Sequence, residues 1–271
     1  MLSYRHAFHA GNFADVLKHL VQIEILLYLQ KKEKPFIYID THAGAGAYSL
    51  DSMEANKTQE YRQGIERILL LDWPELSNYQ DIVRTQKGEY PGSPVIAQRL
   101  LREQDHALLF ELHPNDGVAL QQRMARDKRI RVRLEDGLRG LIAALPTPTK
   151  RGLVLMDPSY EMKDDYDKVI DTLQQAHRRM ATATYALWYP VVDRARIERM
   201  ERSLKKSGIR NIQRYELGLQ ADAEGYGMTS AGMIVINPPW TLLPTMQQLL
   251  PRLAAHLSEQ SVWRCDEWVA E

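Results

Sequence analysis

Cysteine is almost absent from this sequence, and long apolar stretches are absent altogether. Cys265 is the only cysteine among 271 residues. A single thiol excludes an intramolecular disulfide and a cysteine-rich zinc site, and it fits a reducing compartment. No apolar run approaches the length of about 18 residues that would span a bilayer, and the first residues, MLSYRHAFHAGN, lack the apolar core of a secretory signal. We therefore expect a cytoplasmic protein with no membrane partner.

The chain also has no excess of charge of either sign. Lys and Arg number 35, and so do Asp and Glu. No global positive field therefore attracts nucleic acid, and such a partner would have to be bound by local basic surface. Basic clusters at Arg123–Arg133 and Arg194–Lys206 could provide it, but acidic residues interrupt both, and most such runs are solvated helix faces.

Continuous apolar runs alternate with helical patterns along the chain. This alternation predicts an α/β fold with a mostly parallel seven-stranded sheet that is covered on both faces. We expect strands at 36–40, 107–112, 129–136, 152–157, 184–192, 212–219 and 232–237. We expect helices at 12–32, 58–72, 94–104, 115–126, 163–180 and 193–207, the last stopped by Gly208.

The chain length favours a single catalytic domain, 1–271, with one insertion. A nucleotide-binding fold normally starts its first crossover helix directly after the glycine loop. Here the core pattern resumes only at PGSPVIAQRLL, where Ser93 is expected to be the N-cap of a helix and Pro94 its first residue. We therefore interpret residues 50–90 as an inserted helical subdomain.

A glycine loop follows the first expected strand. Asp40, Gly44 and Gly46 fit the pattern D-x-x-x-G-x-G, which is typical of the cofactor loop in S-adenosylmethionine-dependent methyltransferases, where glycine lets the backbone approach the cofactor. Ser49 occupies the third position of the dinucleotide pattern G-x-G-x-x-G, and no phosphate-binding Gly-Lys-Ser/Thr motif is present. A Rossmann-like fold that binds S-adenosylmethionine is therefore favoured over one that binds NAD or ATP.

Acidic residues also end the next two expected strands. Glu111 is placed to bind the ribose hydroxyls, and Asp136 could accept a hydrogen bond from the cofactor's adenine amino group, with Gly137 keeping the wall thin. Ligands of parallel α/β sheets bind at this carboxyl edge. The alternative for Asp40 and Asp136 is that they are turn residues.

The fourth expected strand ends in Asp157-Pro158-Ser159-Tyr160. This tetrapeptide is one residue away from the Asp-Pro-Pro-Tyr signature of enzymes that methylate exocyclic amino nitrogens. Asp157 and the Pro158 carbonyl can accept the two hydrogen bonds of an adenine amino group, and Tyr160 could stack on a flipped base, a contact that contributes about 1–3 kcal/mol. Ser159 replaces the second proline, and we expect a less rigid turn with retained chemistry. Alternatively, the strand simply ends in an Asp-Pro turn.

A second sequence, Asn237-Pro-Pro-Trp240, matches the amino-methyltransferase pattern even better. It follows the seventh expected strand. Because that strand runs antiparallel in the methyltransferase fold, its end lies at the edge away from the cofactor. We therefore interpret this motif as a structural turn.

The first 30 residues combine several basic and aromatic side chains ahead of the first strand. His6, His9, His19 and His42 could hold a metal, but no supporting motif is present, and we expect none. Lys18 and His19 lie on a helix that we expect to cap the cofactor mouth, where a basic group could meet an anion. The alternative is a solvated helix face.

Several segments together resemble one known family. They are SYRHAFHAGNFADVLKHL, YIDTHAGAGAY, YPGSPVIAQRLLREQD, ELHP, GLVLMDPSYEMKDDY, YALWYPVV and AGMIVINPPW. These segments resemble the bacterial RlmJ family of 23S rRNA adenine-N6-methyltransferases. The resemblance implies that His19, His42, Ser93, Glu111, Asp136, Gly137 and Asp157 contact the cofactor. It also implies that Asp157 is the proton acceptor and that Tyr4, His6 and Lys18 face the substrate adenosine.

The resemblance predicts the reaction and its partner. The expected function is methyl transfer from S-adenosylmethionine to the N6 amino group of one adenine in 23S rRNA, free of ribosomal proteins and without a stable protein partner. One alternative is a DNA adenine-N6 methyltransferase, which would use the same residues. The other is a non-catalytic nucleic-acid-binding protein on a decayed methyltransferase fold, which Ser159 suggests. Members of the family have also been described as needed for the use of external DNA, which the active-site residues do not explain. Because the family has proline at position 159, we expect Ser159 to affect the turnover rate rather than the type of reaction.

Overall fold

The computed structural model describes residues 5–223 and 227–271. Its strands are β1 (Ile37–Asp40), β2 (Ala47–Ser49), β3 (Glu89–Pro91), β4 (His106–Phe110), β5 (Ile130–Arg133), β6 (Gly152–Met156), β7 (Thr184–Val191), β8 (Ile212–Gly218), β9 (Ser230–Ile236) and β10 (Val262–Val269). Its helices are α1 (Phe13–Gln30), α2 (Met53–Thr58), α3 (Ile65–Leu69), α4 (Ser77–Arg84), α5 (Ser93–Leu100), α6 (Pro114–Met124), α7 (Gly137–Ala144), α8 (Asp165–Arg179), α9 (Arg194–Lys206) and α10 (Leu242–Leu257). Short 3₁₀ turns span His6–Phe8, Glu60–Gln63 and Pro74–Leu76.

The described part of the chain has a central sheet with the strand order β10-β8-β9-β7-β6-β1-β4-β5, and a layer of helices lies on each of its two faces. The five strands from β7 to β5 are parallel, and β9 runs antiparallel between β7 and β8. This is the Rossmann-like arrangement of class I methyltransferases, and it confirms the predicted fold. The sheet has eight strands among the described residues rather than the predicted seven, because β10 pairs antiparallel with β8 at one edge.

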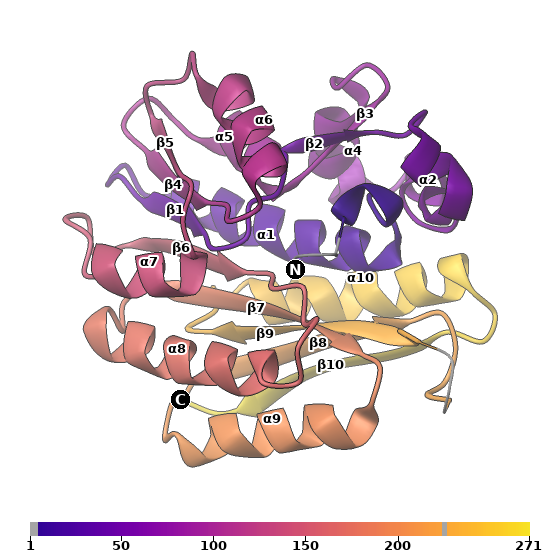
Figure 1. Cartoon of the computed structure of the whole chain (residues 1–271). Coiled ribbons are helices and arrows are strands. Elements are labelled where there is room, and N and C mark those ends of the chain that lie inside the picture. Colours follow the sequence, from indigo (N-terminus) through magenta and orange to yellow (C-terminus); the bar gives the residue numbers. More distant parts are fainter. Residues whose placement is uncertain (1–4, 224–226) are drawn as a thin grey trace.

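Helices cover both faces of the sheet, as Figure 1 shows. Buried side chains of α1, α5 and α10 form one hydrophobic core, and those of α7, α8 and α9 form a second core on the opposite face. Every residue of β6 is buried, which explains the continuous apolar run GLVLM in the sequence. The two-sided packing leaves the carboxyl ends of the parallel strands as the edge where a ligand can bind.

Helix α1 begins where the sequence supplies a strong cap. The Asn12 side chain accepts hydrogen bonds from the backbone N–H groups of Ala14 and Asp15, and Gly11 takes a φ of 79° just before it. Most of the helix is buried against the sheet. This cap therefore fixes the direction in which the N-terminal segment approaches the sheet.

The expected start of α5 was wrong by one residue. Gly92 is the N-cap and Ser93 is the first helical residue, because the Ser93 hydroxyl donates to Asp40 Oδ2 at 2.6 Å instead of capping the helix. Helix α9 ends as expected, since Gly208 follows its C-cap with a φ of 77°.

Short elements fill the region between β2 and β3, which pair as a separate two-stranded ribbon. Within it lie α2, α3, α4 and two 3₁₀ turns, where one helix had been expected at 58–72. Gln59 adopts a φ of 54° and interrupts that expected helix. Our interpretation of 50–90 as an inserted subdomain stays a prediction.

Candidate active site

A cavity of about 280 Å³ opens at the carboxyl edge of the parallel strands. Residues that follow β1, β4, β5 and β6 line it, together with side chains of the N-terminal segment and α1. The predicted site residues among its lining are His6, Lys18, His42, Gly44, Ser93, Glu111, Asp136, Gly137, Asp157 and Pro158. The fold thus brings together ten of the residues singled out in the sequence, drawn from positions 6 to 158.

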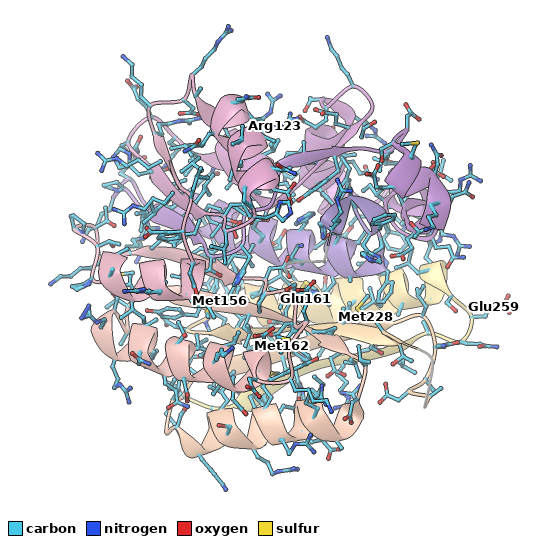
Figure 2. All side chains as sticks on the ribbon, in the orientation of Figure 1. Arg123, Met156, Glu161, Met162, Met228 and Glu259 are labelled. Carbon is cyan, nitrogen blue, oxygen red and sulfur yellow. The ribbon has the colours of Figure 1, made fainter. Side chains whose placement is uncertain are left out.

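The cavity lies where β6 passes into the following loop. Figure 2 labels Met156 at the end of β6 and Glu161 and Met162 in that loop, in the middle of the view. Met156 is fully buried, whereas Met162 is largely exposed. The chain therefore leaves the core within a few residues, and Asp157, Pro158 and Ser159 line the cavity at this transition.

Four other predicted residues are not among this lining. Tyr4 is outside the described residues. Gly46 does not line the cavity, and it has a φ of 86° and accepts a hydrogen bond from the backbone N–H of Gly92. His19 is fully buried, with Nδ1 2.7 Å from the Tyr90 hydroxyl. Burial holds the pKa of His19 well below its ordinary value, so its imidazole is neutral at pH 7.

Tyr160 is the fourth of these residues. Its ring centroid lies 4.3 Å from that of Tyr166 and 6.1 Å from that of Trp188, and its hydroxyl donates to the Trp188 carbonyl. Tyr160 is therefore a neighbour of Trp188, and Trp188, unlike Tyr160, lines the cavity.

Glu111 holds the glycine loop. Its Oε2 accepts from the backbone N–H of Gly44 at 2.7 Å, and its Oε1 accepts from that of His113 at 2.6 Å. Gly44 has a φ of 62°, and a Cβ there would lie 2.1 Å from the Tyr48 hydroxyl, so no other residue fits. Burial raises the pKa of Glu111, although the two N–H groups oppose this shift.

Asp40 stabilises the same loop through hydrogen bonds. It is fully buried and accepts hydrogen bonds from the Tyr38 hydroxyl, the Ser93 hydroxyl and the backbone N–H of His42. Burial also lowers the pKa of His42, which keeps that imidazole neutral where it lines the cavity. Asp40 therefore positions the loop, and His42 and Ser93 are its neighbours that reach the cavity.

Asp136 and Gly137 form the opposite wall. Asp136 caps α7, because its Oδ1 accepts from the backbone N–H groups of Leu138 and Arg139. Asp136 therefore ends a turn, as one interpretation expected, and it also lines the cavity, as the other expected. A Cβ on Gly137 would lie 1.8 Å from the Thr41 carbonyl oxygen, so the start of α7 packs directly on the backbone of the loop after β1.

Asp157, Lys18, Asp15 and His6 form a continuous chain of side-chain contacts that starts in the cavity lining. Lys18 Nζ lies 2.5 Å from Asp157 Oδ2 and 2.7 Å from Asp15 Oδ1, and His6 Nε2 lies 2.9 Å from Asp15 Oδ2. Burial alone would lower the pKa of Lys18, but the two carboxylates hold it well above its ordinary value. Lys18 is therefore a buried ammonium, which rules out the solvated helix face as its environment.

Sequence patterns did not reveal Asp15, Tyr48 or Trp188. Tyr48 lines the cavity, and its ring packs 4.9 Å from that of His6. Asp15 and Tyr48 lie inside segments that carried other predicted residues, whereas the segment of Trp188 carried none. Within residues 5–223 and 227–271, no group of three His, Cys, Asp or Glu side chains could hold a metal, and no helix is long and apolar enough to cross a membrane.

The Asn237-Pro-Pro-Trp240 motif lies at the other edge of the sheet, as expected. Strand β9, which precedes it, is antiparallel to β7, and Ile236 is opposite Tyr185 near the start of β7. Asn237 adopts a φ of 51°, and its side-chain amide donates to the carbonyls of Thr182 and Ala183. The motif is therefore a structural turn.

Replacing this asparagine provides a test of that conclusion. Asn237→Ala should lower the free energy of unfolding by about 1–2 kcal/mol, because alanine is strained in the left-handed region and both amide hydrogen bonds are lost. Urea denaturation measures this change. The methyl-transfer rate per folded molecule should stay unchanged, and a variant of normal stability that is inactive would contradict the structural role.

Comparison with known proteins agrees with this geometry. The family model described as "Ribosomal RNA large subunit methyltransferase D, RlmJ" matches residues 33–270. The chain belongs to the RlmJ family. Ribosomal RNA large subunit methyltransferase J of Escherichia coli is 51% identical over 264 residues, which cover 95% of this chain and 94% of that protein. Its counterpart in Haemophilus influenzae is 46% identical over 283 residues, which cover 99% of each chain.

A solved structure extends the likeness to three dimensions. The crystal structure of a protein from Legionella pneumophila matches with a TM-score of 0.89 and 36% identity, and it covers 96% of this chain and 98% of that one. As a member of the RlmJ family, this protein is an S-adenosylmethionine-dependent methyltransferase. The cavity fits that cofactor, since carboxylates suited to a sulfonium cation line it, and Gly44 and Gly137 in its lining have no side chain to occupy it.

Proposed function

We propose that this protein methylates the N6 amino group of one adenine in 23S rRNA. The observation that carries the proposal is the position of Asp157 and Pro158, which leave the buried strand β6 directly into the cavity. Family membership, with relatives named as methyltransferases of the large-subunit ribosomal RNA, supports the choice of substrate. An RNA substrate of this kind places the reaction in the cytoplasm.

Asp157 is the acceptor for the adenine amino group in this proposal. Its Oδ2 is bonded to Lys18, and within the described residues Oδ1 has no hydrogen-bond partner, so Oδ1 is available to the amino group. The Pro158 carbonyl accepts the second amino hydrogen. When bound, S-adenosylmethionine supplies an electrophilic methyl group on a sulfonium sulfur. Asp157 orients the nitrogen lone pair toward that methyl and takes up the proton that the nitrogen loses as its bond to carbon forms.

We assign the cofactor to the glycine-loop side of the cavity. His42, Gly44, Ser93 and Glu111 form one wall and Asp136 and Gly137 the other, with Gly46 and His19 supporting the first wall from behind. Glu111 is placed to accept from the ribose hydroxyls, and Asp136 from the adenine amino group of the cofactor.

We assign the target adenosine to the side formed by the N-terminal segment and the loop after β6. Tyr4, His6 and Lys18 contact the nucleoside, and the base stacks on Trp188, which has Tyr160 as an aromatic neighbour. Because His6 and Lys18 line this half of the cavity, we propose that the substrate reaches it as an exposed, unstacked base. We therefore propose protein-free 23S rRNA as the substrate, with no stable protein partner.

A labelling experiment tests the proposal. The purified protein is incubated with radiolabelled S-adenosylmethionine and protein-free 23S rRNA from cells that lack the gene, and the digested RNA is analysed for N6-methyladenosine. We expect one labelled adenine, and less label on assembled large subunits. Preferential transfer to DNA hairpins of matched sequence would favour a DNA methyltransferase, and cofactor binding without transfer to either nucleic acid would favour a non-catalytic protein.

Ser159 offers a separate prediction about the turn that holds Asp157. Ser159→Pro should raise the free energy of unfolding by about 0.4–1 kcal/mol, because a second proline restricts the unfolded chain. The product should be the same modified base. Chemical denaturation and steady-state rates measure the two effects, and a variant that loses transfer altogether would show that the serine itself is required.

A further inference from the structure

Asp15 is a buried carboxylate to which the proposed reaction assigns no role. It lies in the first turn of α1, its side chain is 2% exposed, and it does not line the cavity. Isolated charges are costly to bury, so a buried aspartate must be paired. Its partners are what connect it to the site.

Three groups converge on the Asp15 carboxylate. Oδ1 is 2.7 Å from Lys18 Nζ, and Oδ2 lies 2.9 Å from both His6 Nε2 and the backbone nitrogen of Gly11, which donates to it. Lys18 in turn reaches Asp157. Two side chains assigned to the substrate side, from positions 6 and 18, are thus joined by a residue that touches neither cofactor nor substrate.

We propose that Asp15 is a positioning residue for methyl transfer, which holds the Lys18 ammonium between two carboxylates and anchors His6 beside it. This inference rests on the proposed function, in which Asp157 accepts the adenine amino group. With Asp15 present, the Lys18 ammonium is shared between two carboxylates, and Asp157 is not its sole partner. Without the charge of Asp15, the ammonium pairs with Asp157 alone, and Asp157 becomes a weaker acceptor for the amino group.

Helix capping is the purely structural role that Asp15 could have instead. Asn12 already caps the helix, and the bond from the Gly11 N–H needs only one uncharged oxygen. Capping therefore does not require a charge at Asp15, whereas the ion pair with Lys18 does. Burial would raise the pKa of Asp15, but His6, Lys18 and His19 hold it well below its ordinary value. The other titratable groups that interact with Asp15 are His9, Tyr48, Glu60, Tyr79 and Tyr90.

Asp15→Asn separates the two roles, because an amide keeps the size and the bond to Gly11 but removes the charge. We expect kcat for 23S rRNA to fall about 10- to 100-fold, the effect of losing one charge-assisted contact. Cofactor affinity should stay unchanged. Because only one carboxylate would then support the Lys18 ammonium, its pKa falls, and the alkaline limb of the rate profile should move to lower pH.

Asp105→Asn is the matched control. Asp105 is also a fully buried aspartate that accepts a backbone N–H, from Phe36, and an ion-paired side chain, Arg102, but it lies in the loop before β4, outside the cavity lining. Both variants should lose stability in thermal unfolding. Only Asp15→Asn should lower kcat and move the pH limb, and equal behaviour of the two variants would overturn the proposal.

A double-mutant cycle gives a second readout that does not depend on how stable the single variants are. If Asp15 acts through Lys18, Lys18→Met combined with Asp15→Asn should be no slower than Lys18→Met alone. Independent, multiplicative losses would contradict the proposal. Absence of transfer by the wild-type protein would instead contradict the proposed function, so the two failures are distinguishable.

Discussion

Asp157→Asn should reduce methyl transfer by about 10²- to 10⁴-fold, the usual contribution of a positioned acid or base. The amide has almost the shape of the carboxylate, but it cannot take up the proton that the amino nitrogen loses, and it cannot pair with the Lys18 ammonium. Single-turnover assays with labelled S-adenosylmethionine measure the chemical step directly. Asp157→Ala should be at least as slow.

The fold should survive this change. The Asp157 side chain is 15% exposed, and Lys18 keeps Asp15 as a second partner, so no buried charge is left alone. Asp164→Asn, in the same loop but outside the cavity lining, is the control that should retain normal turnover. Near-normal turnover of Asp157→Asn would exclude Asp157 as the acceptor, whatever the result for its neighbours.

The parallel sheet could be predicted because its strands are buried on both faces. Continuous apolar runs such as GLVLM at β6, and the acidic residues that follow them, indicated where the carboxyl edge of the sheet lies. They thereby predicted the cavity residues that follow β1, β4, β5 and β6. Strand β10 was missed for the opposite reason. It lies at the sheet edge, half exposed, and its sequence VWRCDEWV mixes charged and apolar residues without a continuous run.

Outside residues 50–90, two helices of the described chain were missed because their sequences contain residues that disfavour a helix. Helix α10 contains Pro251 in its interior, and α7 is short and includes Gly137 and Gly140. Tertiary packing overrides these preferences, since Leu249, Leu250 and Leu253 of α10 are buried in the core. Propensity alone could not foresee that compensation.

No local sequence pattern could predict that Asp157, Lys18 and Asp15 are in contact. Lys18 and Asp157 are 139 positions apart, and nothing near either residue indicates the other as its partner. The family resemblance assigned them separately, one to the substrate and one to the cofactor and the proton. Only the fold places Lys18 Nζ 2.5 Å from Asp157 Oδ2. Because Lys18 also pairs with Asp15, the three charged side chains interact as one group.

Gly137→Ala should abolish tight cofactor binding and also destabilise the fold. The added Cβ would lie 1.8 Å from the carbonyl oxygen of Thr41 and 2.6 Å from its carbonyl carbon. Thr41 cannot give way easily, because its backbone N–H donates to the Leu155 carbonyl and ties it to β6. The start of α7 must therefore move, at a cost of about 1–3 kcal/mol typical of overpacking.

That movement also carries Asp136 away from the cavity wall, since Asp136 caps the same helix. We expect the affinity for S-adenosylmethionine to fall by at least about tenfold, which corresponds to losing about 1.4 kcal/mol of binding free energy. Calorimetric titration measures it, and thermal unfolding measures the stability. Gly208→Ala is the control, because its φ of 77° makes alanine strained while no atom lies within 4 Å of the new Cβ. It should cost stability without changing cofactor affinity, so wild-type affinity in Gly137→Ala would show that the cofactor does not use this wall.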